Sequence, residues 1–322
     1  MARLSTIKRV IRHRLGGPPA VAPNEEKARR KAERQARKAE KRGRADFLLE
    51  AAPMTPYVAV EIGDELIFTS TRDTGLGTQV FVGRWRKDLT VLERAVEWMA
   101  GNGIAMPADP VFVDVGANIG TTTVMALRRH GFASGVTIEP SPANGRLLRL
   151  NVVANDLEER VRILPVAASE EAGEIHFDVS NANWGGHRVS DGDGPTTVTV
   201  EAVTLDGLVE RGVVLPERVG LVWIDAQGHE PAVLAGASHL IEQGTPTVVA
   251  IRQVKGDPDV ARPWVAPPAT RAAVLDTLRR SYTEAVELRK NSKQGRAVHP
   301  VNELDTLVDS WRACQDLLLV RR

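Results

Sequence analysis

The chain has 322 residues, of which 43% are hydrophobic and 26% are charged, and it contains one cysteine. This length accommodates one α/β domain of roughly 200 to 230 residues with additional segments. A single cysteine excludes an intrachain disulfide and a cysteine-rich zinc site, and the sequence lacks the run of 18 apolar residues that a transmembrane helix needs. These features predict a cytoplasmic protein.

The net charge of +1 conceals an uneven distribution of charge. Residues 1–44 contain 15 Lys or Arg and 4 Glu, a balance of +11, so residues 45–322 contain 27 Lys or Arg and 37 Asp or Glu, a balance of −10. The sequence therefore predicts a basic arm followed by an acidic body.

The basic arm has two helical patterns. In residues 1–15, apolar side chains recur at helical spacing among basic ones, at Leu4, Ile7, Ile11 and Leu15. In residues 25–44 each glutamate lies four residues before an arginine, and this order stabilises a helix by roughly 1 to 2 kcal/mol in total. The pairs are Glu25 and Arg29, Glu26 and Arg30, Glu33 and Arg37, and Glu40 and Arg44. The arm is either a solvated helix or partly disordered tail, or a surface that binds anionic membrane, nucleic acid or a protein partner.

Residues 45–104 are predicted as a segment that leads into the main α/β domain. Residues 57–62 and 65–70 alternate in polarity around Gly63 and Asp64, which predicts a β-hairpin, and residues 89–99 have the periodicity of a helix.

The stretch VFVDVGANIG, residues 111–120, predicts a buried strand that turns into a helix. We expect this helix to run from Asn118 to His130 and to end at Gly131. In open α/β sheets, ligands bind beyond the carboxyl ends of the strands, and a glycine-rich turn lets the backbone approach them. The junction is therefore predicted to be a ligand site.

The acidic residues near this turn distinguish it from a dinucleotide site. The segment from Gly116 to Gly120 lacks the G-x-G-x-x-G spacing, and Asp114 precedes it. A second strand, residues 135–138, ends at Glu139, where a carboxylate accepts hydrogen bonds from ribose hydroxyls. A ligand with a ribose and a cationic group would suit both acids.

Further strands and helices alternate after this point. Strands at 161–165, 221–224 and 247–251, with helices at 142–155 and 230–243, complete a set of five parallel strands. Beyond them the sequence predicts helices at 271–280 and 301–313 and two final strands, at 283–288 and 317–320.

An insertion separates the third and fourth strands. Residues 174–178 and 196–202 are predicted to form a hairpin around the turn-rich residues 181–195. Trp184 and His187 in that loop either reach a substrate or pack locally. Asp191 and Asp193 leave a metal requirement open, and no residue is predicted as a metal ligand.

Four motifs resemble those of S-adenosylmethionine-dependent methyltransferases, and more narrowly of the FkbM family. They are VDVGANIG at 113–120, IEPSPAN at 138–144, TLD at 204–206 and IDAQGHEPAVLAGA at 224–237. The resemblance covers residues 105–252. It implies a seven-stranded, mostly parallel, Rossmann-like sheet in residues 105–322, with helices on both faces, the last strand antiparallel, a hairpin insertion and an N-terminal helical extension.

The resemblance also implies the cofactor and its site. The residues expected to bind S-adenosylmethionine are Asp114, Gly116, Asn118, Gly120, Thr121, Glu139, Ala167 and Asp225. The same family usually ends its fifth strand in a glutamate, whereas this chain has Arg252 there, which reverses the charge at the rim of the site.

Two residues are candidates for catalysis. A sulfonium methyl group is already activated, so the enzyme must mainly align an acceptor oxygen and remove its proton. His229 is predicted to take that proton, with Asp225 orienting its ring. The alternatives are that His229 only begins the next helix and that Asp225 is a cap or a positioning carboxylate, while Glu230 supplies favourable charge at the helix N-terminus.

The function predicted from these features is O-methylation of a hydroxyl on a sugar, glycan or natural-product scaffold. An RNA methyltransferase that uses the basic arm is disfavoured because the body is acidic and only 4% of residues are aromatic. A non-catalytic scaffold is disfavoured by the presence of Asp114, Glu139 and Asp225. The protein is expected to be either cytoplasmic throughout or peripheral at a membrane surface through residues 1–44.

Overall fold

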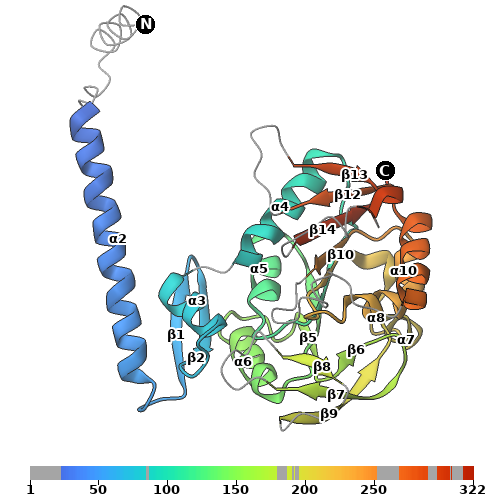
Figure 1. The fold of residues 1–322 in the computed structure, drawn as a ribbon, viewed down its shortest axis with the longest axis horizontal. Helices are drawn as coiled ribbons and strands as arrows, with labels where there is room; N and C mark the ends of the chain where they lie inside the picture. The colour runs from blue at the N-terminus through green and yellow to red at the C-terminus, as the bar shows by residue number, and fades with distance from the viewer. Residues whose placement is uncertain are drawn as a thin grey trace, which may run out of the picture.

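A computed structural model describes residues 23–84, 87–179, 187–190, 192, 196–251, 268–288, 296–304, 306 and 315–322. Its centre is an eight-stranded sheet in the order β13-β12-β14-β11-β10-β3-β4-β5 (Figure 1). Five neighbouring strands of this sheet are parallel. They confirm the five predicted strands: β3 (Val111–Val115), β4 (Ser134–Ile138), β5 (Val161–Leu164), β10 (Val219–Ile224) and β11 (Thr247–Ile251).

Three strands complete the sheet where two were predicted: β12 (Glu284–Glu287), β13 (Val298–Pro300) and β14 (Gln315–Val320). β14 runs antiparallel to β11 and β12, as expected of the last strand. The additional strand, β13, has three residues, ends in proline and pairs with β12 at the edge of the sheet. A strand this short leaves no alternating pattern in the sequence. Of the predicted helix 301–313, the structure describes a 3-10 turn at Val301–Glu303, and most of the remainder lies outside the described residues.

Helices cover both faces of the sheet. One face packs against α4 (Lys87–Gly101), α5 (Thr121–Arg129) and α6 (Pro142–Val153), and the other against α7 (Leu205–Glu210), α8 (Glu230–Ala235), α9 (Ser238–Glu242) and α10 (Pro268–Ser281). Successive residues of the central strands point to opposite faces of the sheet, so they pack into two separate hydrophobic cores. Phe112 and Trp223 belong to the first, and Val113 and Val222 to the second. Both faces of the central strands are buried, which explains their nearly continuous apolar runs.

The predicted helix 230–243 is in fact two short helices, α8 and α9, separated at Gly236 and Ala237. Gly236 packs so closely on Ser169 that a Cβ atom there would lie 2.1 Å from the Ser169 carbonyl oxygen. The Gly236 carbonyl accepts a hydrogen bond from the backbone N–H of Asp206, and the Asp206 carboxylate accepts one from the N–H of His239 in α9. The break is therefore set by contacts with distant segments.

A second, four-stranded sheet forms the insertion, in the order β6-β9-β7-β8. Its strands are β6 (Ala167–Ala168), β7 (Gly173–Asp178), β8 (Arg188–Ser190) and β9 (Thr197–Val203). The antiparallel pairing of β7 with β9 confirms the predicted pairing, but β8 lies within the predicted turn and pairs with the other edge of β7. Trp184, Asp191 and Asp193 lie outside the described residues.

The N-terminal elements are α2 (Pro23–Ala51), the hairpin β1 (Tyr57–Ile62) and β2 (Glu65–Ser70), and α3 (Leu76–Gly83), which was not predicted. α2 is a long rod beside the body, and the predicted boundary at residue 44 falls inside it (Figure 1). Two predicted ion pairs form, Glu26 with Arg30 and Glu40 with Arg44, whereas Glu33 pairs with Arg29 instead of Arg37. Among the described helices, none combines the length and apolar composition that a bilayer span requires.

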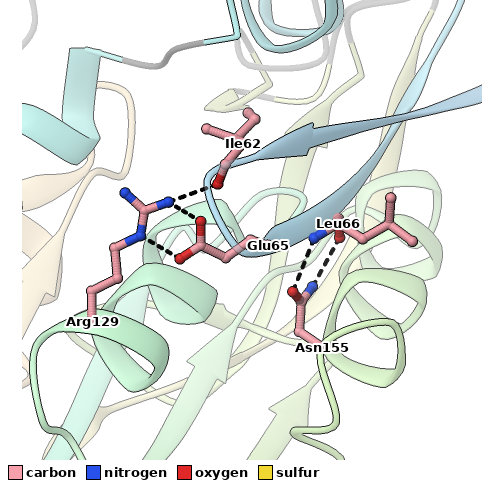
Figure 2. A network of polar contacts seen from close by, with 5 residues as sticks. All are labelled: Ile62, Glu65, Leu66, Arg129 and Asn155. Atoms are coloured by element: carbon pink, nitrogen blue, oxygen red, sulfur yellow. Dashed lines mark hydrogen bonds and ion pairs between the residues drawn. The ribbon is translucent and has the colours of Figure 1, made fainter.

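Two asparagines, one in α6 and one just after it, hold the hairpin on the large α/β domain. The Asn155 amide donates to the Leu66 carbonyl at 2.9 Å and accepts from the Leu66 N–H at 3.1 Å, as Figure 2 shows. Asn151 does the same with the backbone of Phe68. Beside them, Arg129 of α5 forms an ion pair with the buried Glu65 (Figure 2). The side chains of Asn151 and Asn155 pair with the backbone of β2 as a neighbouring strand would.

We expect Asn155→Ala to lower the free energy of unfolding by about 1 to 3 kcal/mol, because two backbone groups of Leu66 lose their partner. Urea denaturation measures this change. The same replacement at the exposed Asn302 is the control and should have little effect. A loss no larger at Asn155 than at Asn302 would show that the hairpin does not depend on this contact.

Candidate active site

The site begins where the central parallel strands end together. The register places Val115 of β3 beside Ile138 of β4 and Ile224 of β10. The residues that follow these strand ends therefore lie at one edge of the sheet, and they are Gly116, Glu139 and Asp225. Three predicted site residues are thus brought together by strand register alone.

The turn after β3 requires its glycines. Gly116 has φ 78°, and a Cβ atom on it would lie 2.1 Å from the Asp225 carbonyl oxygen. Gly120 has φ 79°, and a Cβ atom there would lie 2.2 Å from Leu148 Cδ1. Asn118, between them, also has a positive φ of 55°. Because this conformation is not helical, α5 begins at Thr121 and not at the predicted Asn118.

Glu139 ties the glycine turn to the start of α6. One carboxylate oxygen accepts the N–H of Asn118 at 2.8 Å. The other accepts the N–H of Ser141 at 2.9 Å and lies 3.4 Å from the Asn144 amide nitrogen. Glu139 is only 5% exposed, and its position at the end of β4 is the one predicted for a ribose-binding acid.

A second turn follows β10 and contains the predicted catalytic residues. Asp225 is buried and accepts a hydrogen bond from the Gln227 amide at 2.7 Å. The Glu230 carboxylate, 1% exposed, accepts the backbone N–H groups of Ala226 at 3.1 Å and Gly228 at 3.0 Å. Glu230 therefore fixes the turn as well as placing charge at the start of α8.

The ring of His229 has a different partner from the one we expected. Its Nε2 lies 2.9 Å from Ser169 Oγ, on the segment that follows β6, whereas the contact just described joins Asp225 to Gln227. Burial lowers the pKa of His229 below its ordinary value. The imidazole is therefore neutral at pH 7 and held in a defined orientation.

A pocket of about 620 Å³, part of it open solvent, lies over these turns. Six of the predicted site residues line it: Gly116, Asn118, Glu139, Ala167, Asp225 and His229. Asp114, Gly120 and Thr121 are not in the lining. Asp114 is 1% exposed within β3 and accepts a hydrogen bond from Thr123 Oγ1 at 2.5 Å, so it fastens α5 to the strand beneath the turn.

The insertion supplies one wall of the pocket. His187 lines the pocket and packs edge-on against Phe177, with ring centroids 5.8 Å apart. His187 thus packs locally and also lines the pocket, while its contact with a substrate stays a prediction. Burial lowers its pKa to about 4. Phe177 and Val189 also line this wall, and sequence reasoning missed them because their strands are short and largely polar.

Among the described residues, no group of three His, Cys, Asp or Glu side chains is arranged to hold a metal ion. Arg252, expected at the rim of the site, lies outside the described residues.

Five parallel strands with an antiparallel β14, helices on both faces and a pocket at the strand ends are the architecture of a class I methyltransferase. The family model described as the methyltransferase FkbM domain matches residues 114–275, half of the chain, so the chain belongs to that family.

Two relatives of known name match the chain. The 2-O-methyltransferase NoeI of Sinorhizobium fredii is 30% identical over 151 residues, which is 41% of this chain and 59% of the relative. The hexuronic acid methyltransferase AglP of Haloferax volcanii is 30% identical over 156 residues, which is 48% of this chain and 61% of the relative. The chain thus spans about 60% of the length of these relatives.

Solved structures also match. The methyltransferase FkbM of Methylobacillus flagellatus is 14% identical, with a TM-score of 0.40, and the match covers 70% of this chain and 47% of that one. The TYW2 protein of M. jannaschii, solved in complex with AdoMet, is 12% identical, with a TM-score of 0.40 and coverage of 83% and 88%.

We expect His187 to make the fold sensitive to acid. Its pKa is about 4 in the folded chain and near 6.5 when unfolded, so the unfolded chain binds the proton more readily between these values. The free energy of unfolding therefore falls as the pH drops from about 6.5 to 4, by about 2 to 3 kcal/mol from this residue. Urea denaturation of the wild type and of His187→Gln at several pH values measures the difference. His239→Gln, at an exposed site, is the control. Parallel pH profiles for the wild type and His187→Gln would contradict the expectation.

Proposed function

We propose that the chain is an S-adenosylmethionine-dependent O-methyltransferase that acts on a hydroxyl of a sugar. The observation that carries this proposal is the convergence of Glu139, Asp225 and His229 on one pocket at the strand ends of an FkbM-family fold. The names of the two relatives, a 2-O-methyltransferase and a hexuronic acid methyltransferase, support a sugar hydroxyl as the acceptor.

The chemistry of the pocket suits the cofactor. S-adenosylmethionine has a ribose diol, an adenine ring, a sulfonium cation and an amino-acid end with one ammonium and one carboxylate group. Glu139, buried at the end of β4, would accept hydrogen bonds from the ribose hydroxyls. The apolar part of the lining would hold the adenine ring, and it includes Ile138, Ala168, Phe177 and Val189. Asp225 and the Gly116 turn would hold the ammonium group of the amino-acid end. When bound, the cofactor supplies a methyl group already activated as an electrophile.

His229 is the proposed base for the acceptor hydroxyl. It lines the pocket, and its lowered pKa keeps it neutral and able to accept a proton. We propose that the Nε2–H donates to Ser169 Oγ, which leaves the lone pair of Nδ1 for the acceptor. Ser169 is then a positioning residue for the base. Asp225 positions the turn through its contact with Gln227.

A methyl-transfer assay with labelled cofactor over pooled glycosides, polyketides and RNA tests this function. Label on a glycoside hydroxyl is the expected result. Label on RNA would favour the RNA methyltransferase hypothesis. Failure to bind S-adenosylmethionine would favour a non-catalytic scaffold.

Replacing Glu139 should weaken cofactor binding. We expect Glu139→Ala to reduce the affinity for S-adenosylmethionine by about 1.5 to 3 kcal/mol, the range for hydrogen bonds to a charged group. Calorimetry measures the affinity, and circular dichroism checks that the variant is folded. Glu174→Ala, at an exposed position of β7, is the matched control. Equal affinities for the two folded variants would remove Glu139 from the cofactor site.

Replacing His229 should slow the chemical step. With an identified acceptor, we expect His229→Asn to lower kcat by about 10² to 10⁴ while cofactor affinity is kept, and the wild-type rate to fall as acid protonates the histidine. Ser169→Ala should lower kcat and move that pH profile, whereas Ser169→Thr, which retains a hydroxyl, should restore both. Near-normal turnover of His229→Asn with an unchanged profile would place the base at Asp225, His187 or solvent.

A further inference from the structure

The basic side chains of α2 lie on one side of the helix. At 100° per residue, nine of the ten Lys and Arg residues of α2 fall within an arc of about 160°. Five of them follow one another at spacings of four, three, four and three residues and form a row about 21 Å long. We call this row the basic stripe, and it consists of Lys27, Lys31, Arg34, Lys38 and Lys41.

The other side of the helix differs in composition. It carries the glutamates Glu33 and Glu40 and four small residues, which are Ala28, Ala32, Ala36 and Ala39. The ion pairs of α2 in the described part of the chain involve Arg29, Arg30, Arg42 and Arg44, and none involves a residue of the stripe. Like charges at these spacings repel one another, so the stripe weakens the isolated helix.

The stripe is exposed and separate from the body. Every residue from Lys27 to Gly43 is exposed. α2 contacts the body through its last turns, where Arg44 donates to the Val82 carbonyl at 3.0 Å and Phe47 stacks on Phe81. Figure 1 shows the N-terminal part of α2 standing clear of the other labelled elements. The acidic body therefore does not neutralise the stripe, which is available to an anionic partner.

An exposed apolar side chain continues the same side of the helix. Leu49 follows Lys31, Lys38 and Arg42 at spacings of seven, four and seven residues, so these four residues share one face. Leu49 is 75% exposed, and Met54, just after the helix, is 78% exposed. Exposure of these two apolar side chains to water is unfavourable, whereas a lipid surface would bury them.

We propose that α2 binds the surface of an anionic membrane through the basic stripe, with Leu49 and Met54 entering the boundary between headgroups and acyl chains. A row of cations along one side of a helix matches a flat layer of lipid phosphates. Nucleic acid fits less well, because the face of the stripe has no aromatic side chain on which a base could stack. This proposal is independent of the proposed methyl transfer.

Sedimentation of the full-length chain with vesicles tests the proposal. We expect binding to phosphatidylcholine vesicles that contain phosphatidylserine, weakened by salt, and no binding to phosphatidylcholine alone. Replacing the five residues of the stripe with Gln should lower the partition coefficient at least about a hundredfold, and Leu49→Ser about tenfold. Binding to RNA or duplex DNA without binding to vesicles would overturn the proposal.

The sequence of α2 offers a control that keeps composition and net charge. Three lysines of the stripe directly precede an alanine of the opposite side, so each pair can be exchanged: Lys27→Ala with Ala28→Lys, Lys31→Ala with Ala32→Lys, and Lys38→Ala with Ala39→Lys. Each exchange moves one cation by about 100° around the helix. We expect at least about a tenfold loss of vesicle binding at unchanged helicity by circular dichroism. Wild-type binding by this variant would show that net charge suffices and would overturn the role of the stripe.

Discussion

The close contact between the turns that follow β3 and β10 is the constraint on which the site depends. The N–H of Asp225 donates to the Val115 carbonyl at 3.0 Å, and Gly116 lies against the Asp225 carbonyl with no space for a side chain. Because the two backbones touch, the ends of β3 and β10 cannot separate. The pocket is thus built on backbone contact, and its side chains are placed by it.

Buried carboxylates then order the turns themselves. Glu139 accepts backbone N–H groups from the glycine turn and from the start of α6, and Glu230 accepts two from the turn that holds His229. A buried carboxylate without such donors would be protonated or would destabilise the fold. The same hydrogen bonds satisfy the buried carboxylate oxygens and fix the backbone of the turns.

The sequence predicted those parts of the fold and site that depend on short segments. The strands that precede Gly116, Glu139 and Asp225 were predicted because apolar runs end there in polar turns, and register brings the three residues together. The partner of His229 was missed because Ser169 is 60 residues away and the approach of the two is decided by packing around Gly236. The same packing breaks the predicted helix 230–243. β13 was missed because three residues carry no periodicity.

The hairpin β1 and β2 is joined to the site more directly than the predicted division at residue 104 indicates. Asn151 of α6 bonds to the backbone of Phe68 in β2 and also donates to the Ile119 carbonyl in the glycine turn at 2.7 Å. One fully buried amide therefore links α6 to two other segments, β2 and the glycine turn. α2 packs on α3, which follows the hairpin, so residues 45–104 form the physical connection between the exposed basic helix and the turn beside the pocket. That connection makes the N-terminal segment part of the support of the site, although its sequence has none of the four motifs.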